Sequence, residues 1–437
     1  MQTQADNSRS KIMVTGAEGF LGSHLIRALR ARHYDVLCCG RNAKRLQNLF
    51  PECLVIEADF SEGQRPEYWT PHLDGVSTII NTAGIFQEHG RNTFVAAHRD
   101  GPIALFQAAE RAGVNRVIQV SALGADQHST TPYHVTKHAA DMALSQLALE
   151  WIVIQPSIIY GSEGRSLAFL SGLAALPLIP LVGKGDQLLQ PVSIDDVTTA
   201  VLHLVPSSGP AKIVVAAVGG DALSLRQMLN RLRLWLGFRP TVELGIPLCV
   251  MHLFAKLGQL LRWEFVHSGA LSMLCRGNVA NPTPFSKILG RTPRTFTDSF
   301  QPHHGTTADR WQASLYFLRP ALRLSIASVW IITGIISLWI YPRESSEHLL
   351  IQAGVSEEIA PYLLNGLAVT DIGLGIGTWM KWHMSIISIT QLCLIIAYSL
   401  VIATALPEFV IHPFGAIVKN GPLFVATMVM MALEGDR

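Results

Sequence analysis

Short apolar runs alternate with longer stretches of helical periodicity from Lys11 to about Gly161. Five runs have the length and composition of buried β-strands, at 11–16, 35–40, 54–59, 77–84 and 116–122, and a further strand is expected at 151–161. Helices are expected between them, at 20–33, 92–113 and 132–149. Strands separated by helices need right-handed crossovers, so the pattern predicts an α/β fold with a doubly wound parallel sheet.

The pattern becomes less regular after this region, up to residue 310. It predicts a strand followed by a helix over 191–205, another strand over 212–218, and an apolar helix over 245–262. That last helix contains Lys256 and Arg262. Two cations argue against a membrane span, so we expect a helix that is buried or lies on a membrane surface.

The final 127 residues consist mainly of long apolar runs with few charges. They hold 6 Lys/Arg and 8 Asp/Glu, about 11 % of their residues, against about 17 % in the first 310. A helix must be about 20 residues long to cross a hydrocarbon core about 30 Å thick. The apolar runs therefore predict an all-α transmembrane bundle of four helices, with spans at about 324–341, 359–380, 384–406 and 416–433.

These patterns divide the chain into four parts and suggest an orientation. We expect a polar tail at 1–10, an α/β domain at 11–240, a smaller lobe with the apolar helix at 241–310, and a membrane domain at 311–437. The polar tail has no apolar signal-peptide core. Arginines precede the first span, whereas the next loop carries four Glu and one Arg. The positive-inside rule then predicts a multi-pass protein of the cell inner membrane, with a cytoplasmic N-terminal domain.

Composition excludes several classes of protein. Hydrophobic residues make up 49 % of the chain and charged residues 15 %, with a net charge of +2. These values exclude a disordered chain, and the absence of a basic block gives no reason to expect a nucleic-acid partner. The six cysteines form no CxxC pair, so we expect reduced, buried thiols. His134 and His138 lie one helical turn apart without an evident third ligand, so no metal site is predicted.

A glycine-rich turn links the first predicted strand to the first predicted helix. Glycines in this turn allow a sharp bend and a close approach of the backbone to a pyrophosphate, which the helix N-terminus then binds. The strand–turn–helix context therefore predicts a dinucleotide-binding turn. Its residues are Gly16, Gly19, Phe20, Leu21 and Gly22.

The residues after the next strands bear on the choice of cofactor. The second strand ends at Arg41, with no acid to bind a ribose 2′-hydroxyl, and an arginine there can pair with a 2′-phosphate, helped by Lys44 or Arg45. We therefore expect NADP(H) in preference to NAD(H), although NAD(H) remains a possible cofactor. The rest of the site is expected at Asp59 and Phe60 near the adenine, and at Ala83 and Gly84 under the adenosine ribose.

Tyr133 and Lys137 are four residues apart, which places them on one face of a predicted helix. An ammonium beside a phenol favours the phenolate and lowers the pKa of the phenol from its usual value of about 10. Tyr133 would then act as a general acid toward a carbonyl group that receives a hydride.

These motifs together resemble a known family. About the first 300 residues resemble extended or atypical short-chain dehydrogenases/reductases. The matching segments are TGAEGFLG, NTAG, YHVTK, QPSIIYG and PVSIDDV. VSALGAD is similar to the branch that includes the NADPH-binding accessory subunit of respiratory complex I. The final segment resembles DoxX-like membrane proteins in the layout of its spans and in HPFGAIVKNGP.

The first resemblance implies a Rossmann-like fold with hydride transfer. It implies that Tyr133 is the acid/base, that Lys137 holds the nicotinamide ribose, and that Pro156 lies at the cofactor site. It also implies a hydroxyl that orients the substrate carbonyl. That hydroxyl usually follows Ser121 by one or two residues, where this chain has Ala122 and Leu123.

The departure at these two positions leaves the hydroxyl unassigned. Ser121 is the remaining candidate for the third catalytic residue, with Ser129, Thr130 or Thr131 as substitutes. His98 stands where the family often has Asn. Fast catalysis is therefore in doubt, whereas nucleotide binding is not affected.

Three functions remain open. The first is a membrane-anchored NADP(H)-dependent oxidoreductase that acts on a lipophilic carbonyl or quinone at the cytoplasmic membrane face. The second is a non-catalytic NADPH-binding subunit or redox sensor that docks a membrane protein partner. The third is an NAD-dependent sugar-nucleotide epimerase or dehydratase, which would need an acid near position 40 or 41. Asp371, in the middle of a predicted span, indicates either a structural polar contact or a proton or quinone site.

Overall fold

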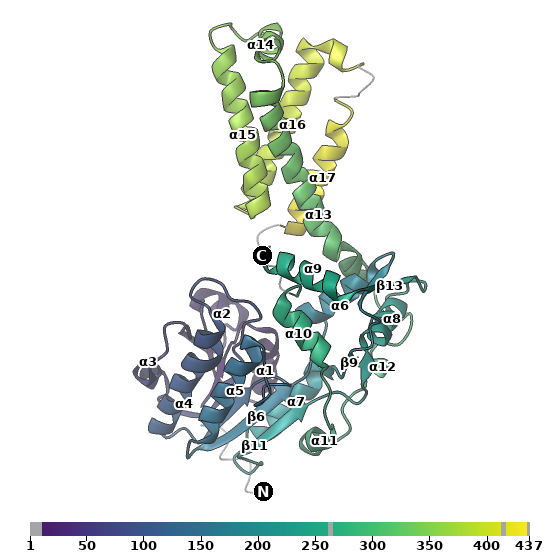
Figure 1. Ribbon diagram of the computed structural model, residues 1–437. Helices are drawn as coiled ribbons and strands as arrows, with labels where there is room; N and C mark the ends of the chain where they lie inside the picture. The colour runs from purple at the N-terminus through teal and green to yellow at the C-terminus, as the bar shows by residue number, and fades with distance from the viewer. Residues whose placement is uncertain (1–10, 261–264, 412–416, 435–437) are drawn as a thin grey trace. The chain divides into compact units, whose positions relative to one another are not determined.

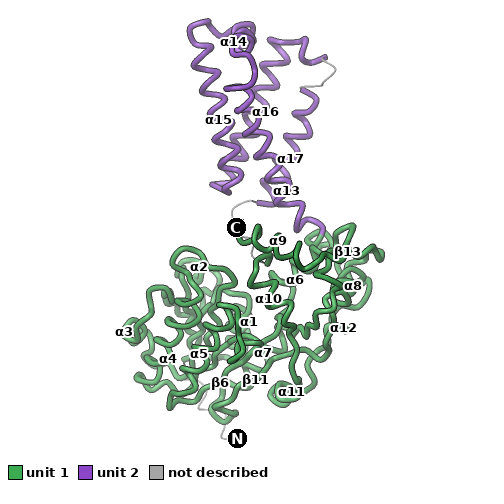
Figure 2. The backbone as a smooth tube through the Cα atoms, viewed as in Figure 1, with its two compact units in different colours: residues 1–313 green, residues 314–437 purple. Residues whose placement is uncertain are grey.

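The computed structural model describes residues 11–260, 265–411 and 417–434. The chain divides into two compact units, residues 1–313 and residues 314–437 (Figure 2). The first unit is built around a β-sheet, and the second consists of helices (Figure 1).

The sheet of the first unit has seven strands in the order β11-β6-β5-β4-β1-β2-β3. All of its pairings are parallel. The chain winds outward from β1 in both directions, which confirms the predicted Rossmann-like doubly wound sheet. Ligands of such sheets bind at the carboxyl ends of the strands where the winding reverses, here β1 and β4. The strands are β1 (Lys11–Thr15), β2 (Asp35–Gly40), β3 (Leu54–Glu57), β4 (Val76–Asn81), β5 (Arg116–Val120), β6 (Glu150–Pro156) and β11 (Ile213–Ala217).

Helices cover both faces of this sheet, which explains why its strands are continuously apolar. Adjacent residues of β4, Ile79 and Ile80, are both fully buried and belong to opposite cores. One face is covered by α1 (Phe20–Ala31), α7 (Ile194–Leu204) and α11 (Thr283–Leu289). The other is covered by α3 (Pro66–Trp69), α4 (Gly101–Arg111) and α5 (Pro132–Ser145), and a π-helix over Val95–Asp100 leads into α4.

A third core forms the smaller lobe of the first unit. The single strand predicted at 151–161 was wrong: β6 ends at Pro156, and β7 (Ile159–Tyr160) pairs outside the main sheet with β10 (Val192–Ser193). The lobe also contains β8 (Ile179–Val182), β9 (Leu188–Leu189), β12 (Leu223–Ser224), β13 (Glu243–Ile246), α6 (Arg165–Ala175), α8 (Leu225–Trp235), α9 (Leu248–Leu260), α10 (Ser268–Arg276) and α12 (Phe296–Ser299).

Helices occupy all four regions predicted as spans. They are α13 (Thr307–Ile335), which a π-helix extends to Ile340, α15 (Ala360–Met380), α16 (Met384–Ala405) and α17 (Asn420–Glu434), with α14 (Arg343–Gln352) in the first loop. By length and apolar composition, Thr307–Ile340 and Met384–Ala405 are candidate membrane spans. Membrane crossing by α15 and by the shorter α17 stays a prediction, and residue 416 of the fourth predicted span lies outside the described residues.

Two glycines let α13 and α15 approach each other closely. A Cβ atom at Gly375 would lie 2.5 Å from Ile331 Cγ1 and 2.8 Å from the carbonyl oxygen of Ala327. A Cβ at Gly334 would lie 2.6 Å from the carbonyl oxygen of Ala368. Small residues at such a contact allow backbone-to-backbone packing, which is the main source of association between helices in lipid.

Polar contacts add to this packing. Glu434 of α17 is 3 % exposed and forms ion pairs with Arg319, Arg323 and Lys381 at 2.9, 3.2 and 3.4 Å. The Tyr398 hydroxyl donates to Asp371 Oδ1 at 3.2 Å, which joins α16 to α15. Asp371 therefore makes a polar contact between two helices, and a role in a proton or quinone site stays a prediction.

We predict that Gly375→Leu lowers the free energy of unfolding of the second unit by about 1–3 kcal/mol, because the larger side chain overpacks the contact with α13. The matched control is Gly373→Leu, since a Cβ at Gly373 meets nothing within 4 Å. A denaturant titration of the full chain in mixed micelles measures both variants. Equal effects of the two substitutions would contradict the close contact.

Candidate functional site

The glycine turn lies against the end of β4. Gly16 has φ +69°, and a Cβ on it would lie 2.8 Å from the amide nitrogen of Ala83. A Cβ on Gly22 would lie 2.3 Å from the carbonyl oxygen of Gly16, so α1 starts in direct contact with the turn. Gly19 is the N-cap of α1 and adds no side chain there. The first amides of α1 remain available for a pyrophosphate.

Phe20 and Leu21 follow in the first turn of α1. Leu21 is buried in the core. The Phe20 ring packs toward the lobe, where a Cβ on Gly161 would lie 2.9 Å from Phe20 Cζ. The side chains of both residues thus anchor the helix to the protein, and their contribution to a bound dinucleotide would come from the backbone.

The basic residues after β2 differ in their surroundings. Arg45 forms an ion pair with Glu18 of the glycine turn at 3.5 Å, and its amide donates to Asn42 Oδ1 at 2.8 Å. Arg41 is exposed and has no ion pair among the described residues. Of the predicted 2′-phosphate ligands, Arg41 and the exposed Lys44 are therefore free to bind, whereas Arg45 already has a carboxylate partner.

Asp59 and Phe60 follow β3 and point to different surroundings. Asp59 is half-buried and accepts the amide of Ser61 at 2.9 Å. Phe60 is buried, with its ring 5.0 Å from that of Trp69. Asp59 is therefore placed at the end of β3, whereas the Phe60 side chain belongs to the core and does not face a ligand there.

Lys137 lies buried at the carboxyl ends of β4 and β5. It is 4 % exposed, and its Nζ donates to the carbonyl oxygens of Val120 at 2.9 Å and Ala83 at 3.3 Å. Its ammonium thus lies at the ends of β4 and β5, and a Cβ on Gly84 would come within 3.4 Å of it. Burial lowers the pKa of Lys137 to about 8. Pro156, at the end of β6, is buried and accepts the amide of Leu123 at 2.9 Å.

Asp141 is a residue of this site that the sequence reasoning missed. It lies four residues after Lys137 and eight after Tyr133, so the same face of α5 presents all three, and that spacing was the available signal. Burial raises the pKa of Asp141 to about 6, and the Ser121 hydroxyl donates to its carboxylate. The structure therefore brings Ser121, Lys137 and Asp141 into one buried polar cluster.

The Ser121 hydroxyl is engaged by Asp141, so it is not free to orient a substrate carbonyl. Two of its possible substitutes also have local partners. Ser129 Oγ donates to the carbonyl oxygen of Gly124 at 2.7 Å, and Thr131 caps α5. Thr130 is exposed.

Tyr133 lies among aromatic rings. Phe86 stacks on it with a centroid distance of 5.3 Å, while Phe94 and His98 contact it edge-on at 6.1 and 5.1 Å. The expected lowering of its pKa was wrong: desolvation, with a contribution from Asp141, raises the pKa of Tyr133 to about 12. The reason is that the Lys137 ammonium donates to backbone carbonyls. Tyr133 is a neutral phenol with a proton to give.

His98 supports the loop beside Tyr133. Its Nε2 accepts the amide of Ile85 at 2.9 Å, and its Nδ1 faces Thr136 Oγ1 at 3.4 Å. Burial and the neighbouring Lys137 keep the pKa of His98 well below its usual value, so the ring is neutral with its proton on Nδ1. A neutral imidazole adds no second charge next to the ammonium.

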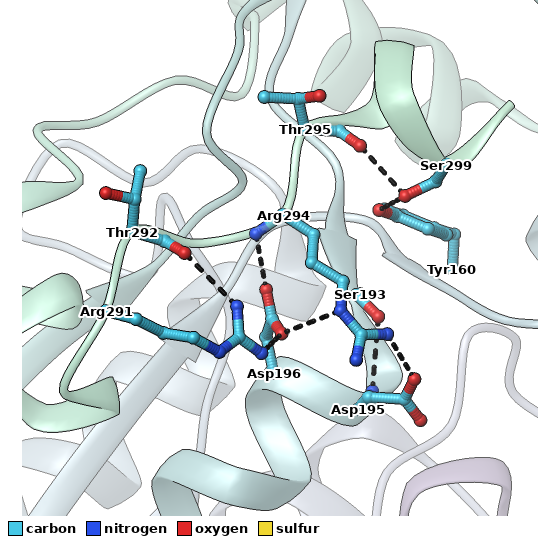
Figure 3. A network of polar contacts seen from close by, with 9 residues as sticks. All are labelled: Tyr160, Ser193, Asp195, Asp196, Arg291, Thr292, Arg294, Thr295 and Ser299. Atoms are coloured by element: carbon cyan, nitrogen blue, oxygen red, sulfur yellow. Dashed lines mark hydrogen bonds and ion pairs between the residues drawn. The ribbon is translucent and has the colours of Figure 1, made fainter. Parts of the chain in front are cut away.

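A cavity of about 670 Å³ lies elsewhere in the first unit, beside α7 and the segment 294–300. Figure 3 shows the polar network next to it, in which Asp196 is fully buried and binds Arg291 and the amide of Arg294. Asp195 pairs with the side chain of Arg294. This network joins α7 to the segment 291–294. Asp195 and Arg294 also line the cavity, which does not include Tyr133 or Lys137.

A glycine turn at the reversal point of a doubly wound sheet, next to a tyrosine–lysine pair, is typical of an NAD(P)-binding Rossmann domain. Residues 16–172 match the NAD(P)H-binding family, and residues 327–428 match the DoxX-like family. The chain therefore joins an NAD(P)-binding domain to a DoxX-like domain.

Several proteins are similar to the first domain. A ceramide reductase of Caulobacter vibrioides is 28 % identical over 183 residues, which are 41 % of this chain and 56 % of that protein. The mitochondrial NADH dehydrogenase [ubiquinone] 1 alpha subcomplex subunit 9 of Arabidopsis thaliana is 26 % identical over 229 residues, 50 % of this chain and 56 % of that protein. The chain thus spans little more than half the length of these relatives.

Solved structures show the same fold. The Bordetella bronchiseptica enzyme WbmG in complex with NAD has a TM-score of 0.54 at 16 % identity, covering 71 % of this chain and 97 % of that one. A UDP-glucuronic acid 4-epimerase from Bacillus cereus, in complex with UDP-glucuronic acid and NAD, has a TM-score of 0.52 at 17 % identity, covering 70 % and 99 %. At these identities the likeness concerns the fold alone.

We predict that kcat/KM for NADPH-dependent carbonyl reduction falls as the pH rises through about 8, the pKa of Lys137 in the free protein. Above that pH the lysine is neutral, and it no longer offers the nicotinamide ribose the charged donor that the resemblance assigns to it. The matched variant is Lys137→Arg. Its guanidinium stays charged over this pH range, so its residual activity should not fall as the pH rises through 8. A wild-type profile that is flat to pH 9.5 would contradict the assignment.

Proposed function

We propose that this chain is a membrane-anchored, NADP(H)-dependent oxidoreductase that reduces a lipophilic carbonyl compound or quinone at the cytoplasmic face of the cell inner membrane. The position of Tyr133 and Lys137 beside the glycine turn carries the proposal. In this mechanism Lys137 binds the nicotinamide ribose, and the bound cofactor supplies the hydride. Tyr133 donates its proton to the oxygen of the accepting carbonyl.

The surroundings of Tyr133 favour an apolar substrate. Phe86 and Phe94 are the rings next to its phenol, together with the neutral imidazole of His98. A relative that carries the name ceramide reductase supports a lipid-soluble substrate. The DoxX-like domain and the apolar helices support a location at the membrane, where such a substrate is concentrated.

The cofactor preference rests on Arg41. This arginine is exposed directly after β2, where the ribose of a dinucleotide is expected, and no acid occupies its place. An acid at position 40 or 41 would favour NAD(H), and its absence also argues against the epimerase or dehydratase alternative. The Glu18 carboxylate does lie near the end of β2, within 3.3 Å of a Cβ built on Gly40, and it is paired with Arg45.

A second candidate is a non-catalytic NADPH-binding subunit that docks a membrane protein partner. Ser121 supports it, because its hydroxyl is bound by Asp141 while Ala122 and Leu123 supply no replacement. The similarity to a subunit of a respiratory complex is a further reason to retain it.

Tyr133→Phe separates the two candidates. We predict that the substitution leaves NADPH affinity unchanged and lowers single-turnover oxidation of NADPH by about 10² or more, the usual size of a general-acid contribution. Detergent-purified protein with short-chain quinones or apolar ketones would be used, with absorbance of the nicotinamide as the readout. Tight NADPH binding without oxidation in the unsubstituted protein would favour the non-catalytic candidate.

We predict that Arg41→Ala weakens NADPH binding about tenfold and leaves NADH binding unchanged, because only NADPH carries the phosphate that the guanidinium would bind. Arg45→Ala is the matched control, since Arg45 is already paired with Glu18. Fluorescence titration of both cofactors measures the effect. Equal losses for the two cofactors would contradict a 2′-phosphate contact.

A further inference from the structure

Helix α9 (Leu248–Leu260) of the first unit has three distinct faces. One face is packed against the lobe through Met251, Ala255 and Gly258. A second, polar face is exposed and contains His252, Lys256 and Gln259. Each set follows the spacing of one side of an α-helix.

The third face is apolar and yet exposed. Its members recur at i, i+3, i+4 and i+7, with exposed fractions of 38, 69, 47 and 44 % for Val250, Leu253, Phe254 and Leu257. We call these four residues the α9 stripe. Large apolar side chains that form a continuous exposed stripe indicate a surface that a lipid bilayer or another protein covers.

The helix that continues into a candidate membrane span starts inside the first unit. This helix, Thr307–Ile340, has Trp311 66 % exposed near its start and an uncharged apolar run at 324–340. Arg310, in its first turn, stacks over the ring of Phe238 at 4.6 Å, and Phe238 lies ten residues before α9. The start of this helix is therefore packed against the segment that leads into α9.

The chain after α9 leads back to the proposed catalytic tyrosine. Phe265 stacks on Phe169 of α6 at 5.2 Å and contacts Phe86 at 6.4 Å. Phe86 in turn stacks on Tyr133. A series of aromatic rings thus connects the end of the α9 region with the phenol.

We propose that α9 lies in the membrane interface, with the α9 stripe among the lipid acyl chains and Lys256 at the level of the phosphates. A helix of 13 residues is too short to span, and an apolar stripe beside a basic polar face is the arrangement of an interfacial helix. The aromatic series then gives a membrane-dissolved substrate an apolar route to Tyr133; this second part rests on the proposed function.

The position of α9 is tested on the full chain in proteoliposomes of neutral and anionic phospholipids. Cys249, Cys275 and Cys393 are exposed, so the expectation of buried thiols was wrong for these three, and they are first replaced by serine. A bimane fluorophore is then attached at Leu253→Cys in one sample and at Gln259→Cys, on the polar face, in the other. Quenching by phospholipid with a nitroxide on its acyl chain is compared with quenching by aqueous iodide.

We expect the acyl-chain nitroxide to quench the label at 253 at least about twofold more than the label at 259, and iodide to show the opposite order. Equal lipid quenching at the two positions would overturn the proposal. So would a label at 253 shielded from both quenchers, because the stripe would then be covered by a second copy or by the helices of the second unit. The measurement needs no turnover, so failure of the proposed reductase activity leaves its outcome intact.

The route is tested separately with Phe265→Gln in the same vesicles. We expect a KM for an apolar ketone raised about tenfold with kcat retained, since a polar side chain would weaken passage without touching the reacting atoms. A lowered kcat with unchanged KM would contradict the route while leaving the interfacial position of α9 unaffected.

Discussion

The arrangement of the NAD(P)-binding site depends on one buried cation. The ammonium of Lys137 can be accommodated in the interior because two backbone carbonyl oxygens accept hydrogen bonds from it. One belongs to Val120, the last residue of β5, and the other to Ala83, in the loop after β4. Those two oxygens are in place only when β4 and β5 pair in parallel and α5 crosses their ends. The position of the ammonium thus depends on the sheet topology, and the same helix carries Tyr133 one turn away.

The neighbouring titratable groups limit the energetic cost of burying that charge. His98 stays neutral beside it, and Asp141 supplies a compensating carboxylate that also takes the Ser121 hydroxyl. Because Asp141 accepts the Ser121 hydroxyl, this hydroxyl is not available to a substrate. A reductase built on this site would therefore depend on Tyr133 and Lys137 more than relatives in which a separate hydroxyl is free.

Much of this arrangement was predictable from sequence, because local patterns encode it. The strand–turn–helix around Gly16 and Gly22, the parallel sheet and the position of Tyr133 relative to Lys137 all depend on spacings within short segments. The Tyr133 pKa was mispredicted because the direction of the Lys137 ammonium is set by carbonyls of two other strands. The contacts of Phe86 with Tyr133 and with Phe265 were not recognised because 47 and 179 residues separate the two pairs along the chain. The break after Pro156 was missed because Ile159 and Tyr160 are as apolar as the strand before them.

In the proposed reaction, hydride leaves NADPH for a carbon atom of a substrate held at Tyr133. Single turnover with NADPH deuterated at C4 and an apolar ketone tests it, with mass spectrometry of the recovered alcohol as the readout. We expect deuterium on the carbinol carbon from one of the two C4 stereoisomers only, and formation of this product about 10²-fold slower with Tyr133→Phe. Bound NADPH that keeps its deuterium in the unsubstituted protein would contradict hydride transfer to these ketones and point to a non-catalytic nucleotide-binding role.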